Sequence, residues 1–272
     1  MAGSERDATA AAVRRRAARR RAVVVAATTA VSALAAAAIG ACGGTEKASG
    51  RPTPPGQLPQ GAETVRLDPA NFTTNIDNPY LPMKPGDRWV YSDTDRGVRH
   101  TVVVTVTPQT KVVDGVRARV VHDTERQRSG LVEDTFDWYA QDRAGNVWYL
   151  GEATQSYRNG RPRSTTGSWE AGKAGAQAGI IMPAKPQAGV QYRQEYRKGV
   201  AEDGARVLSV DEQAQAPQGH YDNVLLTKEF TPIDPRDLEY KFYAKGVGLV
   251  MAVGVSGDSS RQELLRYRKG GG

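Results

Sequence analysis

Four acidic residues within a short stretch are the clearest candidates for chemistry in this chain: Glu133, Asp134, Asp137 and Asp142. Glycosidases use paired carboxylates, about 5–5.5 Å apart in retaining enzymes and about 6.5–9.5 Å apart in inverting ones. On one strand Glu133 and Asp137 share a face, but they lie about 13 Å apart at roughly 3.3 Å per residue. The spacing therefore predicts no such pair unless one partner comes from another strand.

The same cluster has a structural interpretation. Its carboxylates fit the solvated face of a strand whose other face is formed by Val132, Phe136 and Trp138. Asp142 fits the chemistry of a hairpin turn better than that of a metal site. We therefore interpret these residues as surface positions of a strand.

Other catalytic signatures are missing from the sequence. His100, His122 and His220 occur singly, without the spacing of zinc ligands, and we expect them at surface or hairpin positions. The segment 167–172 has the wrong residue order for the nucleophile elbow of serine hydrolases. The sequence thus predicts no catalytic, cofactor-binding or metal-binding residue, and it favours a protein without enzymatic activity.

The N-terminus has the three parts of an export signal. A basic stretch ends at Arg21, the uncharged run Ala22–Ala41 follows, and Ile39-Gly40-Ala41 leads directly to Cys42. This junction resembles the lipobox of bacterial lipoproteins, in which the cysteine is diacylated and the signal is cut before it. The resemblance implies a signal peptide over residues 1–41 and a lipid on Cys42, which is the only cysteine of the chain.

Two alternatives concern the same segment. Ala22–Ala41 has about the 20 residues that a single membrane-spanning helix needs, although its alanines make it weakly apolar. Arg20 and Arg21 loosely resemble a twin-arginine export signal, without the usual Ser or Thr before the pair. The route of export is therefore left open.

The charge of the chain is concentrated in this leader. The formal net charge is +7, of which residues 1–41 carry +5, so +2 remains for the rest. Such scattered charge does not support nucleic-acid binding. Residues 42–69 are rich in Gly, Pro, Ser and Thr and predict a disordered tether.

Beyond the tether the pattern is that of strands. Residues 101–107 are β-branched throughout, Asp114-Gly115 marks a turn, and residues 134–140 alternate before a second turn. After residue 70 no long apolar stripe has helical spacing. We predict an all-β domain over residues 70–268, an antiparallel curved sheet in the form of a half-barrel or sandwich.

An internal repeat supports two similar halves. Residues 81–85 recur as residues 182–186, and Trp138, Tyr139 and Ala140 recur as Phe242, Tyr243 and Ala244. The halves would span about 80–150 and 181–252, joined by the stretch 167–179; chance similarity between β-rich segments is the alternative. We expect apolar faces at these positions: Trp89, Phe136 and Trp138 in the first half, and Tyr192, Tyr240 and Phe242 in the second.

Two strand motifs suggest a family. Gly86-Asp87-Arg88-Trp89-Val90-Tyr91 and Tyr243-Ala244-Lys245-Gly246-Val247-Gly248-Leu249-Val250 resemble motifs of uncharacterised, actinobacterial-type lipoproteins. The resemblance covers residues 70–268 and implies a β domain, but the family carries no established activity. By architecture alone, the chain is also faintly similar to half-barrel periplasmic lipoprotein carriers, which bind acyl chains in a concave sheet.

Two classes of function follow from the sequence. The first is a lipoprotein on the outer face of the bacterial cytoplasmic membrane, anchored through Cys42, that acts as an envelope-structural module or binds an apolar or envelope ligand. The second is a hydrolase of envelope carbohydrate or lipid whose site is assembled from distant strands. A mostly apolar cavity would favour the first class, and converging carboxylates with perturbed pKa values would favour the second.

Overall fold

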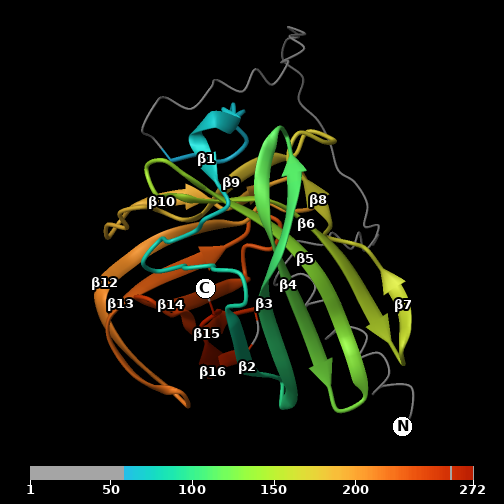
Figure 1. Cartoon of the computed structure of the whole chain (residues 1–272). Helices are drawn as coiled ribbons and strands as arrows, with labels where there is room; N and C mark the ends of the chain where they lie inside the picture. Colours follow the sequence, from blue (N-terminus) through green and yellow to red (C-terminus); the bar gives the residue numbers. More distant parts are fainter. Residues whose placement is uncertain (1–57, 258, 272) are drawn as a thin grey trace, which may run out of the picture.

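The computed structural model describes residues 58–257 and 259–271, and these residues form an almost entirely β structure (Figure 1). One 3-10 turn, η1 (Pro69–Asn71), precedes sixteen strands. They are β1 (Phe72–Thr73), β2 (Arg88–Asp95), β3 (Val98–Val113), β4 (Val116–Gln127), β5 (Gly130–Asp142), β6 (Val147–Arg158), β7 (Arg161–Ser164), β8 (Trp169–Glu170), β9 (Gln177–Met182), β10 (Gln191–Arg193), β11 (Glu195–Tyr196), β12 (Gly204–Ala216), β13 (Gly219–Phe230), β14 (Leu238–Ala244), β15 (Gly248–Ser256) and β16 (Arg261–Arg268).

The predicted signal peptide and Cys42 lie outside the described residues. Within residues 58–257 and 259–271, no helix has the length and apolar character that crossing a bilayer requires.

The strands form one antiparallel sheet with the order β10-β12-β13-β14-β15-β16-β2-β3-β4-β5-β6-β9-β11, and β1, β7 and β8 pair beside this path. The sheet bends into a nearly closed half-barrel (Figure 1). The prediction of an all-β antiparallel sheet, as a half-barrel or a sandwich, is therefore confirmed in the form of the half-barrel.

Two meanders of five strands have the same topology. The strands β2 to β6 follow one another in the first, and β10, β12, β13, β14 and β15 follow one another in the second. The fourth strand of each carries a bulge at matching residues, between Trp138 and Tyr139 in β5 and between Phe242 and Tyr243 in β14. The halves are thus alike in strand order; their origin by duplication and their exact limits stay predictions.

The core does not follow the predicted aromatic faces. Trp89 and Tyr192 belong to one buried cluster, whereas Trp138 packs in a second cluster with Trp169. Phe136 is 38% exposed and stacks on His122 with ring centroids 4.4 Å apart. The prediction of one apolar face built on Trp89, Phe136 and Trp138 is therefore wrong, because the curved sheet distributes these rings over different environments.

The last part of the predicted tether is packed rather than disordered. Leu58 packs against the larger core cluster. Arg193 donates from its backbone N to Pro59 O at 2.7 Å. The guanidinium group of Arg193 donates to the carbonyl oxygens of Gly61 and Glu63, both at 2.8 Å. These bonds hold residues 58–63 against β10; residues 42–57 lie outside the described chain.

Candidate functional site

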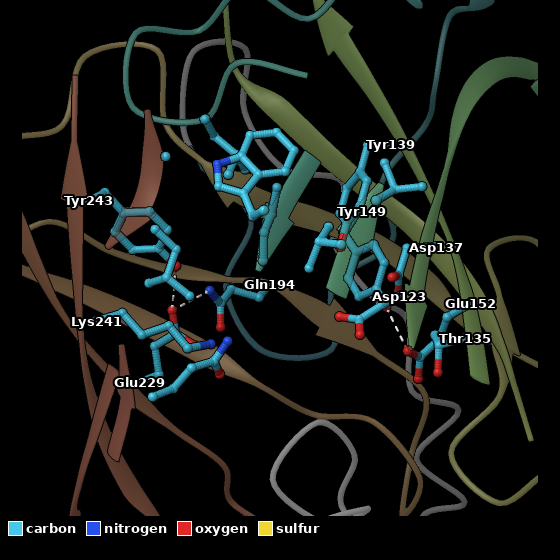
Figure 2. Close-up of a pocket in the computed structure, with 18 of the residues that line it drawn as sticks. Asp123, Thr135, Asp137, Tyr139, Tyr149, Glu152, Gln194, Glu229, Lys241 and Tyr243 are labelled. Carbon is cyan, nitrogen blue, oxygen red and sulfur yellow. Dashed lines mark hydrogen bonds and ion pairs between the residues drawn. The ribbon is translucent and has the colours of Figure 1, made fainter. Parts of the chain in front are cut away.

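A cavity of about 250 Å³ lies between the two halves of the sheet (Figure 2). Its volume is slightly below the range of about 300–1,000 Å³ that is common for small-molecule sites. Strands β4, β5 and β6 supply one wall and strands β13 and β14 supply the opposite wall. Because both meanders contribute, neither half forms the cavity by itself.

The lining is strongly acidic. It includes nine carboxylic side chains and a single basic residue, Lys241. The carboxylic residues are Asp93, Asp123, Glu125, Asp137, Glu152, Glu195, Asp203, Glu229 and Glu239. From residue 42 onward the formal net charge of the chain is +2, so the acidic lining differs from the part of the chain that contains it.

Asp137 and Glu152 converge from neighbouring strands on one hydroxyl group. They are directly opposite each other in the β5–β6 pair. Tyr149 Oη lies 2.7 Å from Asp137 Oδ1 and 2.8 Å from Glu152 Oε2. Burial raises the pKa of Tyr149 well above its usual value, and the charges of Asp137 and Glu152 add to this effect. The phenol therefore stays protonated.

This arrangement corrects the interpretation of the acidic cluster. Glu133 and Asp137 are only 6% and 8% exposed, and Thr135, Asp137 and Tyr139 alternate toward the cavity. The polar face of β5 is thus the inner face of the half-barrel, covered by the other half instead of by solvent. Alternation along one strand identifies two faces but does not say which of them the rest of the fold covers.

Asp142 occupies the turn position expected for it. Its Oδ1 accepts from Asn146 N at 2.9 Å, and its Oδ2 accepts from Asn146 Nδ2 and Trp148 Nε1, both at 2.8 Å. The carboxylate therefore organises the β5–β6 hairpin and is absent from the cavity lining.

The opposite wall is built around an ion pair. Glu229 on β13 contacts Lys241 Nζ closely, and it also accepts from Gln194 Nε2 at 3.1 Å and Tyr243 Oη at 3.3 Å (Figure 2). Lys241 Nζ lies 3.5 Å from Glu239 as well. Burial alone would lower the pKa of Lys241, but Glu229 and Glu239 raise it overall, so the lysine remains charged and engaged by two carboxylates.

Glu195 on β11 is the most deeply buried carboxylate of the lining. It is 2% exposed, and neither of its carboxylate oxygens has a hydrogen-bond partner among the described residues. The Asp203 carboxyl and the Trp169 indole N–H are its polar neighbours; both perturb its pKa, and Trp169 Nε1 itself has no acceptor in good geometry. Burial raises the pKa of Glu195 well above its usual value, and the charges of Asp203 and Glu152 add to this effect.

Asp203, a half-buried residue, lies beside Glu195. Burial, with a smaller contribution from Glu229, raises its pKa to about 7 against the opposing effects of Thr231 and Glu195. Two neighbouring carboxyls that both favour protonation hold at least one proton near neutral pH. A ligand in the cavity would therefore most readily change the protonation state of the Glu195 and Asp203 pair.

The structure does not bring the three histidines together with these groups. His100 is 4% exposed and contacts Glu125, so of its expected surface or hairpin positions the surface is wrong; it pairs with Asp93 next to the β2–β3 hairpin turn. His122 lies 2.5 Å from Asp134, and His220 lies 3.2 Å from Asp222. Among the described residues, no group of three or more His, Cys, Asp or Glu side chains has the arrangement of a metal site.

Sequence reasoning missed most of the site. No local motif marks Tyr149, Gln194, Glu195, Asp203 and Lys241, and the cavity that brings them together is lined by strands far apart in the chain. The repeat gave the one available signal: the matching positions Tyr139 and Tyr243 both line the cavity.

Comparison with known proteins adds little to this geometry. No protein-family model and no curated protein match the chain. A crystal structure of a "putative lipoprotein" from Parabacteroides distasonis ATCC 8503 is similar over 70% of this chain and 98% of its own, with 14% sequence identity and a TM-score of 0.42.

Proposed function

We propose that this chain is a membrane-tethered, extracytoplasmic lipoprotein that binds a small ligand in the cavity between its two halves. The cavity carries the proposal, because both meanders are needed to enclose it and its buried lining includes a carboxylate without a hydrogen-bond partner. Buried polar groups are normally satisfied, so an exception in the lining of a pocket needs an explanation, and a bound ligand would supply it.

The anchoring part of the proposal rests on the sequence. Lipidation of Cys42 after removal of residues 1–41 would hold the domain at the outer face of the cytoplasmic membrane. A single acyl chain attaches a protein to a membrane only reversibly, whereas two acyl chains anchor it stably. The diacylated cysteine of the lipobox family supplies two.

Intact-mass measurement of the membrane-extracted protein tests the anchor. We expect a species that begins at Cys42 and carries a lipid-sized mass increment, and we expect Cys42→Ala to release the folded domain from the membrane. A mature chain that retains residues 22–41 would overturn this part of the proposal.

Native mass spectrometry of the same membrane-extracted protein tests the binding role. We expect a fraction of the molecules to retain a small non-covalent ligand that is lost on denaturation. If instead the protein fractionates only with large envelope assemblies and retains nothing, a structural role replaces the binding role.

One observation favours the hydrolase as a second candidate. Asp137 and Glu152 lie 2.7 and 2.8 Å from the same hydroxyl oxygen, so these two carboxylate oxygens are at most about 5.5 Å apart and do not exceed the spacing of about 5–5.5 Å in retaining glycosidases. Here, however, Tyr149 Oη occupies the space between the carboxylates, where a glycosidic bond would have to lie. Hydrolysis of nitrophenyl glycosides by the wild type, abolished in Asp137→Asn, would support the hydrolase.

A further inference from the structure

We propose that the cavity is a binding site for a small organic cation, an ammonium group attached to an apolar or aromatic body. This inference rests on the ligand-binding role proposed above and names the chemical class of the ligand. Three features of the lining carry it: its charge balance, the position of Glu195, and its aromatic rings.

The charge balance of the lining is one-sided. Lys241 is the single basic residue among 25 lining residues, and its ammonium group is engaged by Glu229 and Glu239. It therefore leaves no cationic group to attract an anion. A low-dielectric cavity whose walls carry charges of one sign concentrates ions of the opposite charge.

Glu195 provides the position for the ammonium group. Burying a carboxylate is costly, and within the described chain no donor meets good hydrogen-bond geometry at either of its oxygens; the indole N–H of Trp169 is the donor that lies beside it. An ammonium group carries up to three donors and a compensating charge. A cation at Glu195 would thus satisfy the lining carboxylate of which both oxygens lack a bond in good geometry.

Aromatic rings provide the surface for the rest of the ligand. Trp89, Tyr91, Tyr139, Tyr149 and Tyr243 all line the cavity. Cations and apolar groups both bind favourably against such rings.

Two of these rings are held in place by the other half of the molecule. Trp89 Nε1 donates to Val247 O at 2.7 Å, and Tyr91 Oη donates to Leu249 O at 3.0 Å. Their polar ends are therefore already bonded to backbone, and the rings offer the cavity a fixed, largely apolar surface.

The same lining argues against other ligands. Calcium takes about 6–8 oxygen ligands at about 2.3–2.6 Å, and the described residues contain no cluster suited to a metal. An acyl chain with its own carboxylate would place like charges together in a site of low dielectric. An organic cation matches both the acidic groups and the aromatic rings.

Binding of a cation should release protons. Glu195 faces Asp203, Glu152 on β6 and Trp169 on β8, while Asp203 faces Thr231 together with Glu229 and Lys241 of the opposite wall. A ligand cation favours the ionised form of the Glu195 and Asp203 pair and displaces the proton that the empty pair holds. The affinity for the cation should therefore rise between pH 6 and pH 8.

Three probes with one body and different head groups test the proposal by isothermal titration calorimetry on the detergent-purified full chain. They are phenethylamine, 2-phenylethanol and phenylacetate, which are cationic, neutral and anionic. We expect saturable binding of phenethylamine, at least tenfold weaker binding of 2-phenylethanol, and none of phenylacetate. Affinity for the amine should rise severalfold from pH 6 to pH 8, where the amine stays protonated.

A variant and its control locate the head group. Glu195→Gln should weaken binding of phenethylamine at least tenfold and leave binding of 2-phenylethanol unchanged. Glu263→Gln changes the net charge equally on β16, outside the cavity lining, and should leave both affinities as in the wild type. Circular dichroism confirms that both variants are folded.

The results separate this inference from the broader role. Absence of saturable phenethylamine binding, equal or tighter binding of the alcohol or the acid, or an unchanged amine affinity in Glu195→Gln each overturns the cation site. A native ligand that is retained by the membrane-extracted protein and is neutral or anionic would overturn the cation site while supporting the binding role. Retention of no ligand would count against the binding role itself.

Discussion

At the scale of single residues, the unusual feature is a set of buried or half-buried acids that contact phenol hydroxyl groups. Tyr149 Oη contacts both Asp137 and Glu152, and Tyr243 Oη contacts Glu229. Hydrogen bonds to charged groups contribute about 1.5–3 kcal/mol each, more than those between neutral groups. The two tyrosines at matching positions of the cavity walls thus stabilise carboxylates that water would otherwise solvate.

We expect Tyr149→Phe to lower the free energy of unfolding by about 2–4 kcal/mol, because it removes the hydroxyl that Asp137 and Glu152 share. Urea unfolding at pH 7 measures the effect. The control is Tyr157→Phe on the same strand, a partly exposed position where we expect a change within about 0.5 kcal/mol. Equal effects of the two substitutions would contradict a special role for the Tyr149 hydroxyl.

Asp203 should make stability depend on pH in an unusual direction. Its pKa of about 7 in the folded chain exceeds the value of about 3.9 for an unfolded aspartate. Between these values the folded state binds more protons, so the contribution of this carboxyl to stability is present below about pH 4 and is lost as the pH rises to about 7.

Asp203→Asn removes this titration. Relative to the wild type, the variant should gain up to about 1.4 kcal/mol of unfolding free energy per pH unit between pH 5 and pH 7. Urea unfolding at pH 5, 6 and 7 measures the gain, and Asp211→Asn on the exposed part of β12 should show no such trend. A gain that is flat or that shrinks with pH would show that Asp203 is ionised throughout this range.

At the scale of elements, the β5–β6 pair depends on a bulge with one glycine. The register shifts between Trp138 and Tyr139, and Gly151 lies opposite Trp138 with φ +133°. A Cβ atom at Gly151 would lie 2.4 Å from Trp169 O of β8. The bulge thus lets β8 pack directly on β6, next to Tyr149 and Glu152.

Gly151→Ala should therefore cost about 3 kcal/mol or more, through its backbone conformation and the contact with β8. Gly160→Ala in the β6–β7 turn is the matched control, because its φ is +71° but no atom lies within 4 Å of the added Cβ. We expect about 1 kcal/mol there. Thermal unfolding of both variants measures the difference, and similar losses would mean that the contact with β8 relaxes freely.

At the scale of the whole molecule, β16 joins the two halves. It pairs with β15 on one side and with β2 on the other, and Leu264 lies opposite Tyr91 with no exposed surface. The two meanders are therefore continuous through one short strand near the C-terminus. Loss of this strand would leave β2 and β15 with open edges, which promote aggregation.

Leu264→Ala should lower the free energy of unfolding by about 2–5 kcal/mol, because it leaves a cavity in the core beside β2. The next residue provides the control: Leu265 is 43% exposed, and Leu265→Ala should change stability by no more than about 0.5 kcal/mol. Urea unfolding gives both values. Independent unfolding of the two halves in the wild type would contradict their cooperation through β16.

The sequence by itself determined the class of the fold. Alternation of apolar and polar residues, β-branched runs such as 101–107, and the Asp114-Gly115 turn are local signals, because strands and tight turns depend on neighbouring residues. The repeat of Tyr139 at Tyr243 likewise follows from comparing residues along the chain, and both positions follow the same bulge.

Only the tertiary structure decided what the polar faces do. Within its own strand, Asp137 is an alternating polar residue of the kind that fits a solvated surface. Curvature of the sheet and closure through β16 turn this face of β5 inward, opposite Glu229 and Lys241. Glu195 and Asp203 gain their raised pKa values from burial, a property of the assembled half-barrel. Side-chain alternation is set within one strand, but the side of a sheet that becomes a cavity is set by strands far apart in the chain.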